Sequence, residues 1–442
     1  MPTWARNLQL NTVTNISSNT AADAYKAAGY YLPGWRGDAS ENLSAWAAGI
    51  YAPDLGEFGA TVCGSNGHET EPASTLHRFD WAEAKWLTPV APPSIHREVA
   101  PNFPPPPKDA ECWYSGGNGK YPAMTWDQVQ AKNWTVDGPF TVGAYSFSRW
   151  PTRYGCRYDT NIGAAIRYDC MAILPGEPAG VLAMVCSTIS HELNIPGSGA
   201  SITWRYGLSS RTWLPHSVNA MPPRGAQNMS TVTAYSRKHN KVFTANASHD
   251  DMGVYDPATN AHSSVRANSD LTCYAIESNA IVTHGHNSHL LISIGRARGS
   301  DALCLYLVEL DKAVSGGCQT WAVMDRSATN NIAPQRIASI QGADFRNADV
   351  ASLAWAEDEQ KLVLFTPYFN ATTIQVITIP ERWQTEPWPV TAPKLSLAAG
   401  VAGITTGAII KGYKRFSYMP KLRCFGWIGA PESKPVQAIK LW

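Results

Sequence analysis

The sequence lacks the features that mark several classes of protein. Charged residues make up only 16% of its 442 residues and the formal net charge is +1, so no basic surface for nucleic acid or anionic lipid is expected. No uninterrupted apolar run reaches the ~18 residues that a membrane-spanning helix needs. The first six residues also lack the apolar segment of a secretory signal. We therefore expect neither nucleic-acid specificity nor membrane insertion.

Cofactor and catalytic motifs are missing as well. The nine cysteines form no CxxC pair, and their odd number in a chain without an export signal favours buried, reduced thiols. Cys304 and Cys318 form the one pair to consider for a disulfide. No phosphate-binding glycine loop, nucleophile elbow or HExxH helix is present. We therefore predict no catalytic residue, no metal and no cofactor.

What the sequence does contain is a recurring phrase. An apolar run ends in an aromatic or apolar residue, often before Asp, and a Trp follows some residues later. The phrases pair Phe79 with Trp86, Tyr206 with Trp213, Tyr255 with His262 in the place of Trp, Val308 with Trp321, and Ile377 with Trp388. A final copy without Trp lies at residues 436–439. A repeat of this length indicates an architecture before any chemistry is considered.

A second phrase comes before the first one. An aromatic residue leads into a polar turn, and a β-branched or apolar run follows at residues 51–62, 235–244, 355–365 and 418–427. Such a pattern predicts two short strands joined by a turn, with the aromatic phrase as the third strand. Helical spacing of apolar residues is scarce beyond residue 45. The chain is therefore predicted to be all-β.

The spacing of the repeat predicts the number of units. Intervals of about fifty to about seventy residues fit four strands and their loops in one blade of a β-propeller. The interval from Phe79 to Tyr206 is about twice as long, which predicts a hidden unit near residues 140–148. We predict a seven-bladed β-propeller, with six blades as the alternative if residues 90–150 are only an insertion.

At these residues the sequence resembles a known group. The segments 45–53, 58–60 and 63–68, followed by Phe79-Asp80 and Trp86, are similar to Kelch-type and galactose-oxidase-like β-propellers, particularly single-domain propellers of bacteria and bacteriophages. The resemblance covers residues 30–442 and concerns architecture. It places His68 at a strand end near a central channel, with His249 at the equivalent point of a later blade. No stretch matches the copper ligands of galactose oxidase, so no redox activity is implied.

Residues 1–40 differ from the remainder and are predicted to form an arm, with the propeller at 41–442. An Asn-, Thr- and Ser-rich run at 7–20 leads to a two-turn helix at 21–28, which Gly29 ends. The arm packs on the rim, reaches a neighbouring chain or is a disordered tail. Residues 30–35 are predicted to supply a strand that closes the ring against the C-terminal strand.

The second irregular region, residues 88–138, is predicted to be an inserted loop. Its four consecutive prolines at 104–107 favour an extended conformation. Aromatic residues in such a loop indicate either an ordered binding surface, for another chain or a sugar, or contacts that pin the loop to its own blade. The predicted binding residues are Trp113, Tyr114, Trp126, Trp134, His68 and His249.

Three further features of the sequence carry an expectation. The histidine-rich stretch 284–289 either holds a metal with ligands from elsewhere or forms a polar hairpin turn between apolar strands. His68 and His249 either belong to a site or simply end their inner strands. The apolar stretch 395–410 is predicted to form inner propeller strands.

These observations predict a non-catalytic β-propeller that serves as a structural or binding module. The resemblance suggests a bacteriophage virion protein, tail-associated or host-facing, made in the host cytoplasm and assembling with other protein chains, as a homo-oligomer. The alternative is a carbohydrate-binding or carbohydrate-active propeller that uses its open face, for example on a host surface glycan. A third candidate is a cytoplasmic Kelch-like scaffold.

Overall fold

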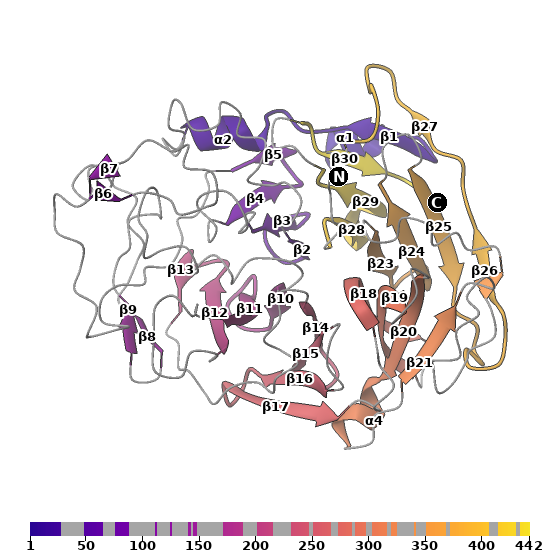
Figure 1. Cartoon of the computed structure of the whole chain (residues 1–442). Helices are drawn as coiled ribbons and strands as arrows, with labels where there is room; N and C mark the ends of the chain where they lie inside the picture. The colour runs from indigo at the N-terminus through magenta and orange to yellow at the C-terminus, as the bar shows by residue number, and fades with distance from the viewer. Residues whose placement is uncertain are drawn as a thin grey trace. The chain divides into compact units, whose positions relative to one another are not determined.

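A computed structural model gives the fold of the chain (Figure 1). It describes residues 1–27, 48–64, 76–87, 111–112, 124–125, 140–142, 145–147, 171–188, 201–214, 231–246, 251–266, 273–284, 288–297, 303–315, 320–324, 340–341, 351–367, 372–405, 414–429 and 434–442. The chain divides into two compact units. Unit 1 comprises residues 1–16, 222–428 and 436–442, and unit 2 comprises residues 17–221 and 429–435.

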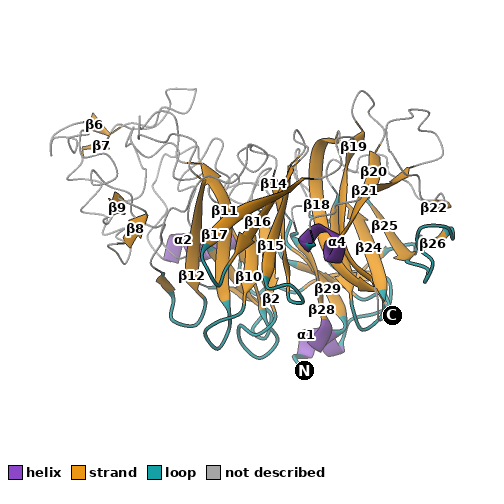
Figure 2. Ribbon diagram, turned by 90° about the horizontal axis from the view of Figure 1, so that it is seen from below, coloured by secondary structure: helices purple, strands orange, loops and turns teal. Residues whose placement is uncertain are grey.

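Unit 1 contains three sheets built from consecutive strands. The first is β14 (Thr231–Ser236), β15 (Lys241–Asn246), β16 (Asp251–Asp256) and β17 (Ala261–Arg266). The second is β18 (Cys273–His284), β19 (Ser288–Ala297), β20 (Leu303–Glu309) and β21 (Thr320–Met324). The third is β22 (Ile340–Gln341), β23 (Ser352–Ala356), β24 (Lys361–Thr366), β25 (Thr373–Thr378) and β26 (Trp388–Thr391). Helix α4 (Leu310–Val314) packs on β19 and β20 (Figure 2).

The fourth sheet of unit 1 joins the two ends of the chain, and we call it the chain-end sheet. Its order is β27-β1-β30-β29-β28. The strands are β27 (Ser396–Leu397), β1 (Thr12–Asn15), β30 (Gln437–Ile439), β29 (Cys424–Trp427) and β28 (Phe416–Met419), with the 3₁₀ turn η7 (Pro420–Leu422) between the last two. Helix α1 (Thr3–Arg6) precedes β1. The strand that pairs with the C-terminal strand is therefore β1, whereas the predicted segment 30–35 lies outside the described residues.

Unit 2 contains two four-stranded sheets and two hairpins. The sheets are β2 (Gly49–Ala52), β3 (Ala60–Cys63), β4 (His77–Asp80) and β5 (Lys85–Trp86), and β10 (Met171–Leu174), β11 (Val181–Thr188), β12 (Ser201–Gly207) and β13 (Thr212–Trp213). The hairpins are β6 (Glu111–Cys112) with β7 (Met124–Thr125), and β8 (Phe140–Val142) with β9 (Tyr145–Phe147). Helix α2 (Ala21–Ala27) confirms the helix predicted within the arm.

Neighbouring sheets within each unit meet through one edge strand of each sheet. In unit 1, β14 contacts β18, β18 contacts β23, and β23 contacts β28, while in unit 2 β2 contacts β10. Thin antiparallel sheets that stack in this way are the blades of a β-propeller. The prediction of an all-β, mostly antiparallel, propeller-type fold is therefore confirmed. None of the described helices has the length and apolarity to cross a membrane.

The predicted number of blades is wrong. Among the described residues, five blades come each from one continuous stretch of chain, and the chain-end sheet is assembled from three separate stretches. The hidden unit expected near residues 140–148 is a two-stranded hairpin, β8 with β9. The long interval instead precedes β10 and β11, which complete the blade that carries Tyr206. Spacing measures chain length between repeats, and it does not separate an inserted loop from a blade.

The aromatic phrase corresponds to the pairing of the third and fourth strands. In three blades its two residues are cross-strand neighbours: Phe79 with Trp86, Tyr206 with Trp213, and Tyr255 with His262. The rings of Tyr255 and His262 are 4.9 Å apart, and those of Phe79 and Trp86 are 5.3 Å apart. Histidine therefore occupies the Trp position in the blade formed by β14 to β17, as the repeat predicted.

Each strand between two blades divides its side chains between them. Along β19, Leu290, Ile292 and Ile294 belong to the apolar core shared with the blade of β22 to β26. Leu291 belongs instead to the core shared with the blade of β14 to β17. Successive side chains of a strand point to opposite faces, so odd-numbered residues of β19 face the earlier blade. This alternation decides which polar residues meet at each blade junction.

One strand prediction fails at the rim. The stretch 395–410 is predicted to form inner strands, but its described part, 395–405, contributes only the two-residue edge strand β27. Of these residues only Thr405 is buried. Gly400 has a φ of +80° and Gly403 lies in open space, which suits a surface connection more than a buried strand. Residues 406–410 lie outside the described part of the chain.

Candidate functional site

The residues predicted to bind a partner cannot be placed. All of them lie outside the described residues: Trp113, Tyr114, Trp126, Trp134, His68 and His249. The same holds for Cys318, so the disulfide to Cys304 stays a prediction, whereas Cys63 and Cys424 are buried. In the described segments no group of three or more His, Cys, Asp or Glu could hold a metal. The site must therefore be built from the polar residues that the fold does bring together.

The histidine-rich stretch forms a hairpin, with Thr283 opposite His289 and His284 opposite Ser288. This confirms the hairpin interpretation of residues 284–289. His289, at the start of β19, is only 7% exposed. Being odd-numbered, it faces the blade of β14 to β17, where the turn after β14 places Ser236 and His239 against it.

We call the resulting cluster the histidine junction. Ser236 Oγ and His289 Nε2 share a hydrogen bond of 2.6 Å, and both residues are buried. The rings of His239 and His289 are 5.5 Å apart in an edge-to-face arrangement. His239 Nε2 lies 2.8 Å from Asp311 Oδ1, and Lys238 Nζ lies 2.7 Å from Asp311 Oδ2. Asp311 belongs to α4, so the turn after β14 is tied to the next blade at two points.

Burial and charge set the protonation of this cluster. Burial is the main cause that lowers the pKa of His289 to about 4, with the charges of His239 and Lys238 adding to it and Asp311 opposing it. Burial by itself raises the pKa of Asp311, but the hydrogen bond and charge of Lys238, together with His239, lower it overall. At neutral pH, His289 is therefore neutral and Asp311 is ionised.

The histidine junction is not a nucleophilic triad. In a triad the Asp and the Ser bind the same imidazole, but here Asp311 is paired with His239 and Ser236 with His289. Ser236 is fully buried, and its Oγ also accepts a 3.3 Å hydrogen bond from the backbone N–H of His239. The cluster is therefore suited to holding two blades in register, and not to attacking a substrate.

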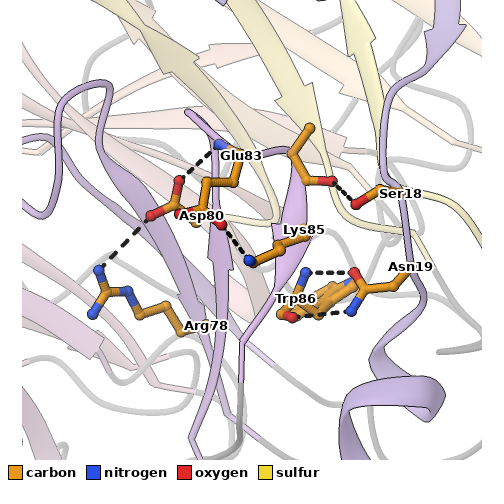
Figure 3. Close-up of polar contacts among 8 residues, drawn as sticks. Ser18, Asn19, Arg78, Asp80, Glu83, Lys85 and Trp86 are labelled. Carbon is orange, nitrogen blue, oxygen red and sulfur yellow. Dashed lines mark hydrogen bonds and ion pairs between the residues drawn. The ribbon is translucent and has the colours of Figure 1, made fainter.

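A second polar cluster lies at the blade junction of unit 2, and we call it the arginine junction. Arg78 of β4 lies near Tyr206 and Arg211, which belong to β12 and to the turn that follows it. The carboxylate of Asp80 is the ion-pair partner of Arg78, with Asp80 Oδ2 3.9 Å from Arg78 Nη2 (Figure 3). Asp80 also caps its own turn, because its Oδ1 accepts a 3.0 Å hydrogen bond from the N–H of Glu83. The charges that act on Arg78 are those of Arg211 and Asp80.

The N-terminal arm is bound to unit 2 by its backbone and by one amide. Ser18 N–H donates to the carbonyl of Ala84 at 2.8 Å. The Asn19 side chain accepts from the N–H of Trp86 at 2.7 Å and donates to the Trp86 carbonyl at 3.0 Å (Figure 3). These bonds continue the sheet beyond β5 and cover its free edge. Residues 12–19 therefore pack on the chain's own sheets.

Sequence reasoning missed these clusters although it named some of their members. His289 was part of the histidine-rich stretch, and His239 and Asp311 stood within the recurring phrases. Residues that meet across a blade junction are far apart in the chain: Ser236 and His289 are separated by 53 positions. One signal was available in the sequence. His289 and Leu291 are two positions apart in one strand, so both side chains face the blade of β14 to β17.

Comparisons with known proteins give no family. No protein-family model matches the chain, and no curated protein matches it. Among solved structures, U3-55K has a TM-score of 0.40 with 9% identity, over 90% of this chain and 95% of that one. A protein of unknown function from Dyadobacter fermentans has a TM-score of 0.38 with 10% identity, over 96% and 98%. The hydrazine synthase of Kuenenia stuttgartiensis has a TM-score of 0.32 with 12% identity, and the match covers 59% of this chain and 61% of that one. At these TM-scores the similarities support no statement about function.

Proposed function

We propose that the protein is a non-catalytic structural or binding module that assembles with further copies of itself. A propeller fold is compatible with such a role, because packed blades form a rigid support for loops that meet a partner. The polar residues of the histidine junction are used to hold blades together. Our proposal takes the inserted loop 88–138 and the arm as the regions through which the protein assembles.

The main support for the proposal comes from exposed apolar residues of the arm and of the chain-end sheet. Four large hydrophobic residues stand out as exposed among those described, and three of them belong to the arm or to the strand beside it. Met1, Leu10 and Leu397 are 59%, 56% and 47% exposed. Leu397 is in β27, the edge strand of the chain-end sheet. An edge strand with exposed apolar side chains is a template for another chain.

The test is the oligomeric state of the full chain, measured by light scattering after size exclusion. We expect the wild type to form a defined oligomer and the Leu10→Ser/Leu397→Ser variant to dissociate at the same concentration. Val314→Ser is the matched control, because Val314 is 45% exposed on α4, away from the chain-end sheet. A wild type that is strictly monomeric, or a control that dissociates equally, would count against the proposal.

The setting we propose for this assembly is a bacteriophage particle, with a Kelch-like propeller as a tail-associated or host-facing component. Its support is the sequence resemblance to propellers of phages, together with the low net charge. Mass spectrometry of purified particles is the test, since a virion component is present at a fixed copy number. Absence from the particles would leave a cytoplasmic module.

The alternative is recognition of a host surface glycan by the aromatic residues of the inserted loop. Trp and Tyr rings stack on sugar faces, so Trp113→Ala should abolish binding on a glycan array. Trp4→Ala, which removes an aromatic residue outside that loop, is the control. Loss of binding in Trp113→Ala alone would favour a lectin-like function over self-assembly.

A further inference from the structure

We propose that the arginine junction binds a small oxyanion (phosphate, sulfate or a carboxylate) between Arg78 and Arg211. This proposal concerns unit 2 and does not depend on the assembly proposed above. It rests on three features of the junction: the placement of two cations, the shortage of acceptors, and access from solvent.

The two arginines come from adjacent blades of unit 2. Arg78 is the second residue of β4 and is partly buried, and Arg211 lies in the turn between β12 and β13. The first strands of these blades, β2 and β10, contact each other. The Tyr206 hydroxyl belongs to the same surroundings. The blades therefore bring two guanidinium groups toward one place.

The acceptors present do not satisfy Arg78. Its side chain is only 18% exposed, and its buried Nε forms no hydrogen bond. Among the described residues its carboxylate neighbour is Asp80, which stands at 3.9 Å, beyond hydrogen-bond distance. A second carboxylate, Glu177, is used by Ser210, whose hydroxyl donates to Glu177 Oε1 at 2.8 Å. A largely buried guanidinium without a close acceptor is costly, and buried polar groups are normally satisfied.

The electrostatics agree with this geometry. The pKa of Arg78 is lowered, first by burial and next by the charge of Arg211, while Asp80 and Tyr206 oppose the shift. The repulsion between the two arginines thus outweighs the attraction of Asp80. An anion between them would reverse the repulsion and supply acceptors to both guanidinium groups.

Geometry also permits entry and recognition. Arg211 is exposed, and its turn conformation is held by its N–H, which donates to the Gly207 carbonyl at 2.9 Å. The guanidinium of Arg211 can therefore close on an anion from the solvent side while Arg78 contacts it from within. Arginine binds phosphate, sulfate and carboxylate through two parallel N–H donors, and such bonds are about twice as strong as neutral ones.

The experiment measures the thermal midpoint of the full chain in sodium phosphate, sulfate or acetate against sodium chloride of equal ionic strength. We expect at least one oxyanion to raise the midpoint in a saturable way. Arg211→Gln should weaken the apparent affinity at least about tenfold, since it removes charge-assisted hydrogen bonds. Arg78→Gln should abolish the response. Comparison of the three salts tells a tetrahedral anion from a carboxylate.

Arg382→Gln is the matched control, because Arg382 is exposed in unit 1 and its loss changes net charge equally. It should leave the response unchanged. Arg211 is exposed, so Arg211→Gln keeps the test decisive even if Arg78→Gln fails to fold. A wild type that responds no more to oxyanions than to chloride overturns the proposal, as does an undiminished response in Arg211→Gln.

Discussion

Two blade junctions of this protein solve the same packing problem with opposite charge arrangements. At the histidine junction, a neutral Ser236–His289 hydrogen bond lies beside Asp311, which is paired with Lys238 and His239. At the arginine junction, Arg78 is near Arg211, and the carboxylate of Asp80 stands at 3.9 Å. Each carboxylate oxygen of Asp311 has a nitrogen of Lys238 or His239 within 2.8 Å, whereas the carboxylate beside Arg78 stands at 3.9 Å. The difference indicates that the histidine junction stabilises the fold, while the arginine junction can also accept an anion.

Removing the His289 side chain should have the largest effect on the free energy of unfolding. His289→Ala creates a cavity and leaves the buried Ser236 hydroxyl without its partner, so we expect a loss of about 2–4 kcal/mol in the free energy of unfolding. Urea denaturation measures it. Ser236→Ala should cost less, because it creates almost no cavity.

The pair should also be coupled. In a double-mutant cycle, Ser236→Ala combined with His289→Ala should cost less than the sum of the single variants, because either change alone already breaks the shared hydrogen bond. Strict additivity would show that the 2.6 Å contact contributes nothing to stability.

Acid should lower the free energy of unfolding by a smaller amount for each buried histidine. The pKa of His289 in the folded state is about 4, below its ordinary value of 6.5, and that of His262 is lowered equally by burial. Between pH 6.5 and 4 these histidines are protonated in the unfolded chain but not in the folded chain. The free energy of unfolding therefore falls as the pH falls. We expect a loss of up to about 2 kcal/mol per histidine between pH 7 and 5.

The depressed pKa of Asp311 adds a further loss only below its ordinary value of 3.8. Unfolding curves in urea at several pH values measure the profile. His289→Gln should flatten it between pH 6.5 and 4, because one titrating group is removed. An unchanged slope in that variant would mean that His289 is protonated in the folded protein.

The smallest effect is expected at the arginine junction without added anions. Arg211→Gln removes a repulsion at an exposed position, so stability in dilute chloride buffer should rise by a few tenths of a kcal/mol. The thermal midpoint is a sufficient measure. A clear fall in stability would mean that Arg211 supports the fold, and the contrast between the two junctions would disappear.

The recurring phrases predicted the local structure well. The hairpin phrases at 51–62, 235–244 and 355–365 became β2 with β3, β14 with β15, and β23 with β24. Both phrases depend on neighbours along the chain, where strand alternation and turn residues act directly. The blade count failed, because it required knowing which segments join the strand order of a sheet.

Propeller-type blades could thus be predicted from the residues alone, because five blades each lie in one continuous stretch of chain and carry the recurring phrase. Only tertiary structure decided that β1 pairs with β30 and that His289 meets Ser236. It also decided that Arg78 is left with a distant carboxylate. These contacts form between stretches that are remote in the chain, and the packing of neighbouring sheets, not local preference, selects them.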